Sequence, residues 1–234
     1  MELLSPAGNL ELALAAFDGG ADAVYGGIAG AFNARMRAAN FTFDTLGKLL
    51  RFAHANGKRV YLTFNTLVKE NELGSMFETL CELAKLRPDA LIVQDAGVIH
   101  TVKKYFPELK LHGSTQMGIH NSAGVKVMEN LGLDRVILER QITLNELKTI
   151  AKNSKIELET FVHGSLCCSL SGRCLLSGHL FGQSGNRGQC KQPCRRQYTA
   201  NGESGYFLSQ GDLCGLSLLD EFKSAGVASL KIEG

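Results

Sequence analysis

The sequence predicts an α/β fold, a closed (β/α)8 TIM-like barrel with a Cys-rich loop insertion after strand seven. Two observations support this prediction. Short apolar runs rich in β-branched residues, eight in all, alternate with segments of helical periodicity along the 234 residues. The composition is that of an ordinary globular protein, with 44% hydrophobic and 21% charged residues, which excludes disordered and collagen-like classes.

The predicted strands are bounded by Gly, Asn or Asp, and their continuous apolar character is typical of strands that are buried on both faces. They cover residues 2–5, 23–25, 60–65, 90–94, 109–114, 135–139, 157–163 and 229–233.

Helical patterns lie between these strands. Asn9 is a suitable N-cap for the first helix, and Gly57 is a stop signal for the second. The predicted helices cover residues 9–18, 43–56, 73–85, 98–105, 122–131, 144–152 and 216–225. Eight strands joined by right-handed crossovers can close into a barrel, and an open doubly wound sheet is the alternative.

The chain stops at SLKIEG, directly after the eighth predicted strand. A complete barrel would add another helix, so we expect the protein to continue beyond Gly234. On this interpretation residues 1–234 form a single barrel domain without its last helix and without any C-terminal domain. Residues 164–205 form a Cys-rich metal-binding insertion.

Two features predict a cytoplasmic protein without a membrane partner. No run of about 18 apolar residues could span a membrane. The N-terminus has no basic flank before its apolar part and carries Glu2 and Glu11, so it does not resemble a secretory signal. The sequence does not predict an oligomeric state.

Basic residues are concentrated in one segment, although the net charge is only +2. Residues 160–202 contain no Asp or Glu but do contain Arg173, Arg187, Lys191, Arg195 and Arg196. Such an asymmetry can mark a site for an anionic partner, and we take these five residues as candidates for substrate binding. The alternative is that they offset the negative charge of a thiolate-bound metal centre.

The seven cysteines are unevenly distributed, and six of them lie after residue 166. An odd number in a chain without a secretory signal argues against a disulfide framework. The surrounding segment is rich in Gly, Ser, Gln and Arg and has few large apolar residues to form a core of its own. A metal centre with thiolate ligands is therefore the expected stabiliser.

The spacing selects four of these cysteines as metal ligands: Cys167, Cys174, Cys190 and Cys194. Cys214 is a rival for the fourth position, Cys168 directly follows a ligand, and Cys81 lies in a helical pattern. Zinc and iron–sulfur clusters both accept four thiolates. Because the CxxC knuckles of a zinc ribbon are absent, the spacing favours a [4Fe–4S] cluster, with zinc and unliganded thiols as alternatives.

Active sites of such barrels lie at the carboxyl ends of the strands. This rule gives Tyr25 as a substrate-binding candidate and five catalytic candidates: Asn65, Gln116, Glu139, Arg140 and His163. Arg140 with Glu139 could equally form a structural ion pair, and His163 could be a hydrogen-bonded core residue. No GxSxG elbow, P-loop or GxGxxG fingerprint is present.

The segment ETFVHGSLCCSLSGRCLLS, residues 159–177, resembles the signature of peptidase family U32, the collagenase-like proteins. The residues that carry this resemblance are Glu159, Phe161, Gly164, Ser165, Leu166, Cys167, Gly172, Cys174, Leu176 and Ser177. The start MELLSPAGNLELALAAFDGGADAVYGG and the end SLKIEG are also similar to the family.

The resemblance implies an iron–sulfur protein of oxygen-independent hydroxylation. Relatives of this kind hydroxylate the wobble uridine of tRNA with prephenate as co-substrate, modify a cytidine of ribosomal RNA, or assist hydroxylation of the ubiquinone ring. Carried onto this chain, the cluster ligands are Cys167, Cys174 and Cys190, with Cys194 or Cys214 as the fourth.

Our leading hypothesis is therefore an iron–sulfur-dependent hydroxylase of a tRNA or rRNA base. The family name implies a peptidase instead, with Cys167 and His163 as the conceivable nucleophile and base. An accessory protein of ubiquinone-ring hydroxylation and a non-catalytic electron-transfer partner are further alternatives.

Overall fold

Eight parallel strands close into a barrel, so the prediction of a (β/α)8 fold is confirmed and the open doubly wound alternative is wrong. The computed structural model describes residues 1–36 and 38–234. Each strand pairs with the next, and the last one pairs with both β7 and β1 to complete the ring. The barrel strands are β1 (Glu2–Pro6), β2 (Ala23–Gly26), β3 (Arg59–Phe64), β4 (Ala90–Val93), β5 (Leu111–Gly113), β6 (Arg135–Ile137), β7 (Glu157–Gly164) and β11 (Ser229–Ile232).

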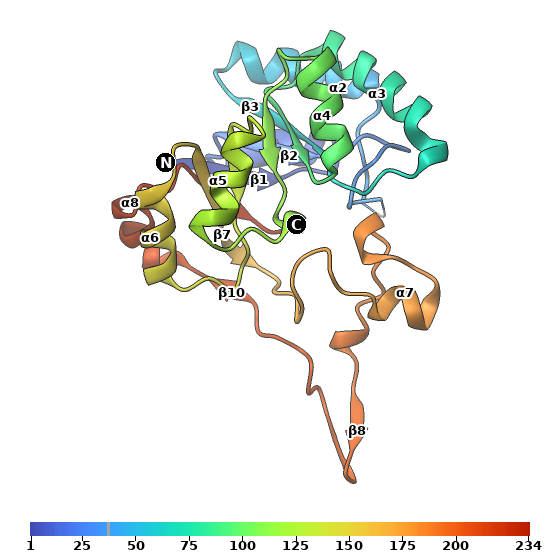
Figure 1. Cartoon of the computed structure of the whole chain (residues 1–234), viewed down its shortest axis with the longest axis vertical. Helices are drawn as coiled ribbons and strands as arrows, with labels where there is room; N and C mark the ends of the chain where they lie inside the picture. The colour runs from blue at the N-terminus through green and yellow to red at the C-terminus, as the bar shows by residue number, and fades with distance from the viewer. Residues whose placement is uncertain (37) are drawn as a thin grey trace.

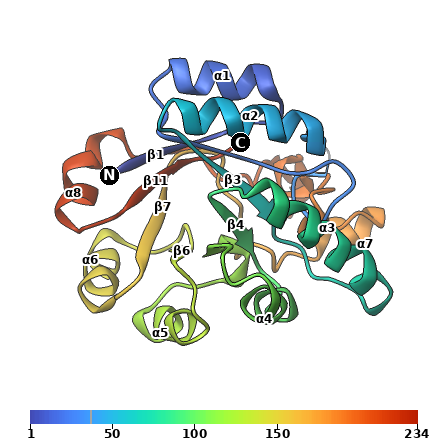
Figure 2. The ribbon, with the colours of Figure 1, turned by 90° about the horizontal axis from the view of Figure 1, so that it is seen from above.

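Helices surround the ring of strands, as Figure 2 shows from above. They are α1 (Leu10–Asp18), α2 (Phe43–Ala55), α3 (Leu73–Leu86), α4 (Ala96–Tyr105), α5 (Ser122–Asn130), α6 (Leu144–Asn153) and α8 (Leu219–Ser224). Asn9 caps α1 as predicted, because its side chain accepts a hydrogen bond from the backbone N–H of Leu12 at 2.8 Å. The helix predicted at 216–225 is shorter, since Leu216–Leu218 form a 3₁₀ turn.

Two apolar clusters hold the barrel together. The smaller one fills the barrel interior with side chains such as Leu4, Tyr61, Ile92 and Phe161. The larger one packs the outer faces of the strands against the helices. Because every barrel strand is covered on both sides, the strands appear in the sequence as nearly continuous apolar runs.

The Cys-rich segment leaves the barrel after β7 and contains elements that the sequence did not predict. These are α7 (Leu176–Phe181), a hairpin of β8 (Tyr198–Ala200) and β9 (Glu203–Gly205), and β10 (Leu213–Cys214). The hairpin extends away from the barrel (Figure 1). β10 then pairs antiparallel with the end of β7, which returns the chain to the barrel. Among the described residues, no helix combines the length and apolar character needed to cross a membrane.

Candidate functional site

A cavity of about 300 Å³ opens at the carboxyl ends of the barrel strands. Four of the predicted substrate-binding and catalytic residues line it, namely Tyr25, Asn65, Gln116 and Arg140. The side chain of Asn65 is fixed from both ends: its Oδ1 accepts from the backbone N–H of Ala34 at 3.0 Å, and its Nδ2 donates to Ser114 Oγ at 3.3 Å. We call this space the mouth cavity.

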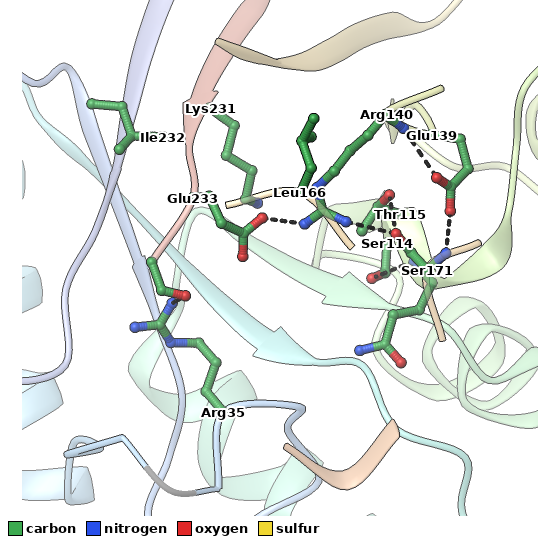
Figure 3. A network of polar contacts seen from close by, with 12 residues as sticks. Arg35, Ser114, Thr115, Glu139, Arg140, Leu166, Ser171, Lys231, Ile232 and Glu233 are labelled. Carbon is green, nitrogen blue, oxygen red and sulfur yellow. Dashed lines mark hydrogen bonds and ion pairs between the residues drawn. The ribbon is translucent and has the colours of Figure 1, made fainter. Parts of the chain in front are cut away.

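Three cationic side chains, Arg35, Arg140 and Lys231, line the mouth cavity together with the carboxylate of Glu233. Arg140 forms an ion pair with Glu233 and donates to Ser171 Oγ at 2.6 Å (Figure 3). Arg35 Nη1 donates to the carbonyl oxygen of Gly234 at 3.1 Å. Within the described residues, Nε of Arg35 and Nε of Arg140 are buried without a hydrogen-bond partner. Buried donors of this kind suit an anionic ligand.

Aromatic rings form part of the same wall. Nζ of Lys231 lies 4.0 Å from the centroid of the Tyr25 ring, and Cζ of Arg140 lies 4.0 Å from that of the Phe161 ring. The hydroxyl of Tyr25 donates to the carbonyl oxygen of Ile232 at 3.0 Å, and burial raises the pKa of Tyr25. Tyr25 therefore keeps its proton and contributes a neutral ring to the cavity.

Lys231 is only 5% exposed, and its ammonium group belongs to a chain of buried ion pairs inside the barrel. Its Nζ donates to Glu159 Oε1 at 3.1 Å, while Glu159 Oε2 accepts from Arg135 Nη1 at 3.0 Å. Arg135 in turn donates to Glu2 Oε1 at 2.6 Å. Burial lowers the pKa of Lys231, and the neighbouring Glu159 carboxylate opposes that effect.

Glu139 does not line the mouth cavity, although the sequence made it a catalytic candidate. Its carboxylate is buried and accepts from the backbone N–H of Ser171 at 2.6 Å and from that of Arg140 at 3.0 Å. The guanidinium of Arg140 pairs with Glu233 rather than with Glu139. Glu139 thus fastens the start of the Cys-rich segment to the barrel.

His163 is also placed outside the mouth cavity. It is exposed at the end of β7, in a ladder position opposite Cys214 of β10. Cys167 lines the mouth cavity and His163 does not.

The four predicted metal ligands line a second cavity of about 140 Å³, which we call the cysteine cavity. It adjoins the mouth cavity, because Cys167, Gly172, Gly185 and Cys190 line both. Cys214, the predicted rival for the fourth position, does not line it.

Cys168 does line the cysteine cavity, although the sequence reasoning gave it little weight. Burial and the neighbouring thiol of Cys194 raise the pKa of Cys168 to about 11. Burial raises the pKa of Cys167 as well, with smaller effects of Cys174 and Cys194 in the same direction. All seven cysteines are free thiols. No group of three His, Cys, Asp or Glu side chains among residues 1–36 and 38–234 could hold a single metal ion.

The five basic candidates of the Cys-rich segment fall into two groups. Arg187 forms two hydrogen bonds with the Glu72 carboxylate, at 2.8 and 2.7 Å, and Arg195 binds Ser209 Oγ and the carbonyl oxygens of Leu166 and Gln210. Arg187 thus joins the segment to the connection that follows β3, and Arg195 holds parts of the segment to one another. The other three, Arg173, Lys191 and Arg196, are exposed.

Sequence reasoning missed three residues that shape the site: Arg35, Asn186 and Lys231. Asn186 joins the Cys-rich segment to the barrel, because its Nδ2 donates to Gln94 Oε1 at 2.8 Å and to Gln116 Oε1 at 2.7 Å. Of these three, only Lys231 could have been recognised from the sequence, because it is a charged residue inside an apolar strand. Arg35 and Asn186 lie in irregular segments, where no periodicity marks them.

Comparison with known proteins supports a relationship over nearly the whole chain. The sequence profile described as peptidase family U32 matches residues 8–234. A solved structure titled as that of a U32 peptidase superposes with a TM-score of 0.67 at 13% identity, covering 100% of this chain and 93% of the other. At that identity the superposition supports the fold alone.

Three curated relatives align with the chain at higher identity. An uncharacterized protease of Methanocaldococcus jannaschii is 41% identical, and a tRNA hydroxylation protein P of Helicobacter pylori is 37% identical; each match covers 100% of this chain and 60% of the relative. The 23S rRNA 5-hydroxycytidine synthase of Escherichia coli is 36% identical, with coverage of 100% and 36%. The chain thus spans at most about 60% of the length of these relatives.

Proposed function

Because the chain belongs to peptidase family U32, we propose that it hydroxylates a base of tRNA or rRNA with the help of a [4Fe–4S] cluster. Relatives named as tRNA hydroxylation proteins and as an rRNA hydroxycytidine synthase support the RNA substrate. Since the chain is shorter than those relatives, the proposal concerns the whole protein to which this barrel belongs.

The observation that carries the proposal is that the mouth cavity and the cysteine cavity share part of their walls. Cys167, Cys174, Cys190 and Cys194 surround the cysteine cavity, and Cys167 and Cys190 also form part of the wall of the mouth cavity. A cluster held by these thiolates would therefore border the space where a substrate can enter. The cluster would supply redox or Lewis-acid chemistry there.

Four thiolates suit either zinc or a [4Fe–4S] cluster. Cys167, Cys174, Cys190 and Cys194 line one cavity and could together hold such a cluster. The cluster is our proposal because the sequence lacks the CxxC knuckles of a zinc ribbon and because of the family resemblance.

The residues of the mouth cavity would bind and orient the reactants. Arg35 and Arg140 offer unpartnered Nε–H donors to an anionic co-substrate, for which prephenate is our proposal because of the family resemblance. Tyr25 and Phe161 add apolar ring surface to the wall, with Lys231 over the Tyr25 ring and Arg140 over the Phe161 ring. A base can reach a concave barrel mouth only when it is unpaired or flipped out of its helix.

The proposal is tested by deleting the gene in the organism that carries it and analysing digested tRNA and rRNA by mass spectrometry. We expect one hydroxylated nucleoside to disappear, to return with the wild-type gene, and to stay absent with a Cys174→Ser variant. If all hydroxylated nucleosides persist in the deletion strain, the proposal is wrong.

The peptidase hypothesis rests on the family name alone. Of the two residues that could serve it as nucleophile and base, Cys167 lines the mouth cavity and His163 does not. No contact among the described residues favours the ubiquinone alternative or a purely electron-transferring role, which both stay hypotheses.

A further inference from the structure

Lys231 combines features of a nucleophilic lysine. Its side chain is almost fully buried in the last barrel strand, yet it lines the mouth cavity. The Tyr25 ring 4.0 Å away and the Phe161 ring 6.0 Å away replace much of its hydration. Among the described residues, Glu159 Oε1 accepts a hydrogen bond from Lys231 Nζ at 3.1 Å. Desolvated lysine amines at such positions attack carbonyl carbons and form Schiff bases.

The surroundings of Lys231 select the class of carbonyl compound. Arg35 and Arg140 line the same cavity, and each has a buried Nε–H without a partner among the described residues. Guanidinium groups bind carboxylates with paired, charge-assisted hydrogen bonds. A ligand that presents a carboxylate to an arginine and a carbonyl to Lys231 carries both groups close together. We infer that Lys231 captures a small 2-oxo acid as a Schiff base in the mouth cavity.

Glu159 can serve as the proton acceptor and then as the proton donor in this step. The Lys231 ammonium passes a proton to the Glu159 carboxylate. The free amine then adds to the carbonyl carbon and forms a C–N bond, and a proton moves from the nitrogen to the oxygen, so that the C=O double bond becomes C–O–H. Glu159 returns the proton to the hydroxyl group, which leaves as water, and an iminium ion remains. No electrons are exchanged with any other reactant.

The charge balance of the barrel interior favours this product. The ammonium and the iminium ion both carry one positive charge, so the buried Glu159 carboxylate has a cationic partner before and after the step. Arg135, at 3.0 Å from the other oxygen of Glu159, holds that carboxylate in position. Glu233 is the only carboxylate lining the mouth cavity within the described part of the chain, and it is paired with Arg140.

This inference rests on the proposed function only for the role of the captured acid, which would be the small co-substrate of the hydroxylation. The experiment is independent of RNA and of the cluster. The full chain is incubated with pyruvate and sodium cyanoborohydride, which reduces the imine to a stable secondary amine. Peptide mass spectrometry then locates the added group.

We expect the modification at Lys231, at least about tenfold faster than at the exposed lysines of the same sample. Acetone, which has the carbonyl but no carboxylate, should label Lys231 more slowly than pyruvate. A Lys231→Arg variant should lose this modification and keep the slow labelling of Lys48 and Lys126, which are exposed on outer helices.

Two results would overturn the inference: absence of the modification at Lys231 in the wild-type chain, or labelling of Lys231 no faster than of the exposed lysines. Because the wild-type result is decisive by itself, a variant that fails to fold does not affect the conclusion. A protein that is labelled at Lys231 but leaves cellular RNA unchanged would retain this inference and contradict the proposed function.

Discussion

Nδ2 of Asn186 donates a 2.7 Å hydrogen bond to Oε1 of Gln116, and this contact joins the Cys-rich segment to the carboxyl end of the barrel. The same amide also donates to Gln94, and its Oδ1 accepts from the backbone N–H of Leu67 at 3.3 Å. One side chain thus connects the segment with the ends of three successive strands. The two cavities adjoin because this attachment fixes the segment over the mouth.

We therefore expect Asn186→Ala to loosen the Cys-rich segment. The change leaves Gln94 and Gln116 without this donor, at a cost of about 1–3 kcal/mol in the free energy of unfolding. Limited proteolysis should cut the segment faster, and thermal denaturation should begin earlier. Asn130→Ala is the matched control, since Asn130 is exposed at the end of α5. Equal proteolysis of both variants would contradict this role.

Gly172 brings the backbone of the Cys-rich segment close to the barrel. Its φ is +72°, and a Cβ atom there would lie 2.9 Å from Cβ of Gln116. We expect Gly172→Ala to lower the free energy of unfolding, because it combines left-handed strain of about 1–2 kcal/mol with overpacking of about 1–3 kcal/mol.

Gly182→Ala separates these two effects. Gly182 has a similar φ of +65°, but an added Cβ would meet nothing within 4 Å. Urea denaturation should therefore show the smaller loss for Gly182→Ala, with the difference giving the cost of the contact with Gln116. A larger loss at Gly182 would show that the contact is not tight.

The lining of the cysteine cavity allows us to predict which cysteine substitutions lower the iron content of the protein. After anaerobic purification the wild-type protein should contain about four irons per chain, together with sulfide. Cys174→Ser and Cys190→Ser should reduce the iron content to a small fraction of that value. Cys214→Ser is the control, since Cys214 lies outside the cysteine cavity, and it should keep the wild-type iron content. Loss of iron from Cys214→Ser alone would reverse the assignment.

The fourth ligand is tested in the same way. Cys194 and Cys168 both line the cysteine cavity. We expect Cys194→Ser to lose the cluster and Cys168→Ser to retain it, because adjacent residues such as Cys167 and Cys168 seldom reach one cluster together. Iron and sulfide assays on the two variants decide between them.

The ion pair between Glu72 and Arg187 makes the free energy of unfolding depend on pH. Hydrogen bonds from Arg187 lower the pKa of Glu72 from 4.5 to about 2. Because the carboxyl group is more acidic in the folded than in the unfolded protein, its stabilising effect is complete above about pH 4.5. The effect is lost as the pH falls toward 2.

The measurement compares the wild type with Glu72→Gln by urea denaturation between pH 3 and pH 7. The difference in free energy of unfolding should be constant above about pH 5 and shrink below it. Glu78→Gln, the same chemical change in an exposed residue of α3, is the control. A difference that grows toward low pH would have the wrong sign for this ion pair.

Most of the fold could be predicted from the sequence because the barrel strands are buried on both faces. Their apolar runs therefore stand out, and the observed strands agree with the predicted ones within about two residues. The largest shift is at 109–114, where Leu109 packs into the outer core before β5 begins at Leu111. The short helix and strands of the Cys-rich segment depend on its attachment to the barrel. No repeating pattern of apolar residues in the sequence therefore predicts them.

The site was less predictable than the fold. The strand-end rule pointed to Tyr25, Asn65, Gln116 and Arg140, and these residues line the mouth cavity because closure of the barrel gathers all carboxyl ends at one mouth. Lys231 was missed, since its acceptor Glu159 is 72 positions away in the sequence. Only closure of the barrel between β7 and β11 brings those two side chains together.

The three exposed basic residues, Arg173, Lys191 and Arg196, should contact RNA phosphates. Replacing all three by Gln should weaken RNA binding and reduce the slope of log K against log salt, by about 0.7 for each lost contact to a single strand. Fluorescence anisotropy at several salt concentrations measures both quantities. Iron content is determined in parallel, because these residues lie close to cysteines in the sequence.

The control removes three exposed lysines from the outer helices, namely Lys85, Lys126 and Lys148. It changes the net charge by the same amount but leaves the barrel mouth intact, so RNA affinity should fall less and the salt slope should stay close to the wild-type value. Equal effects of the two triple variants would mean that binding follows net charge, and the assignment of the exposed basic residues would then be wrong.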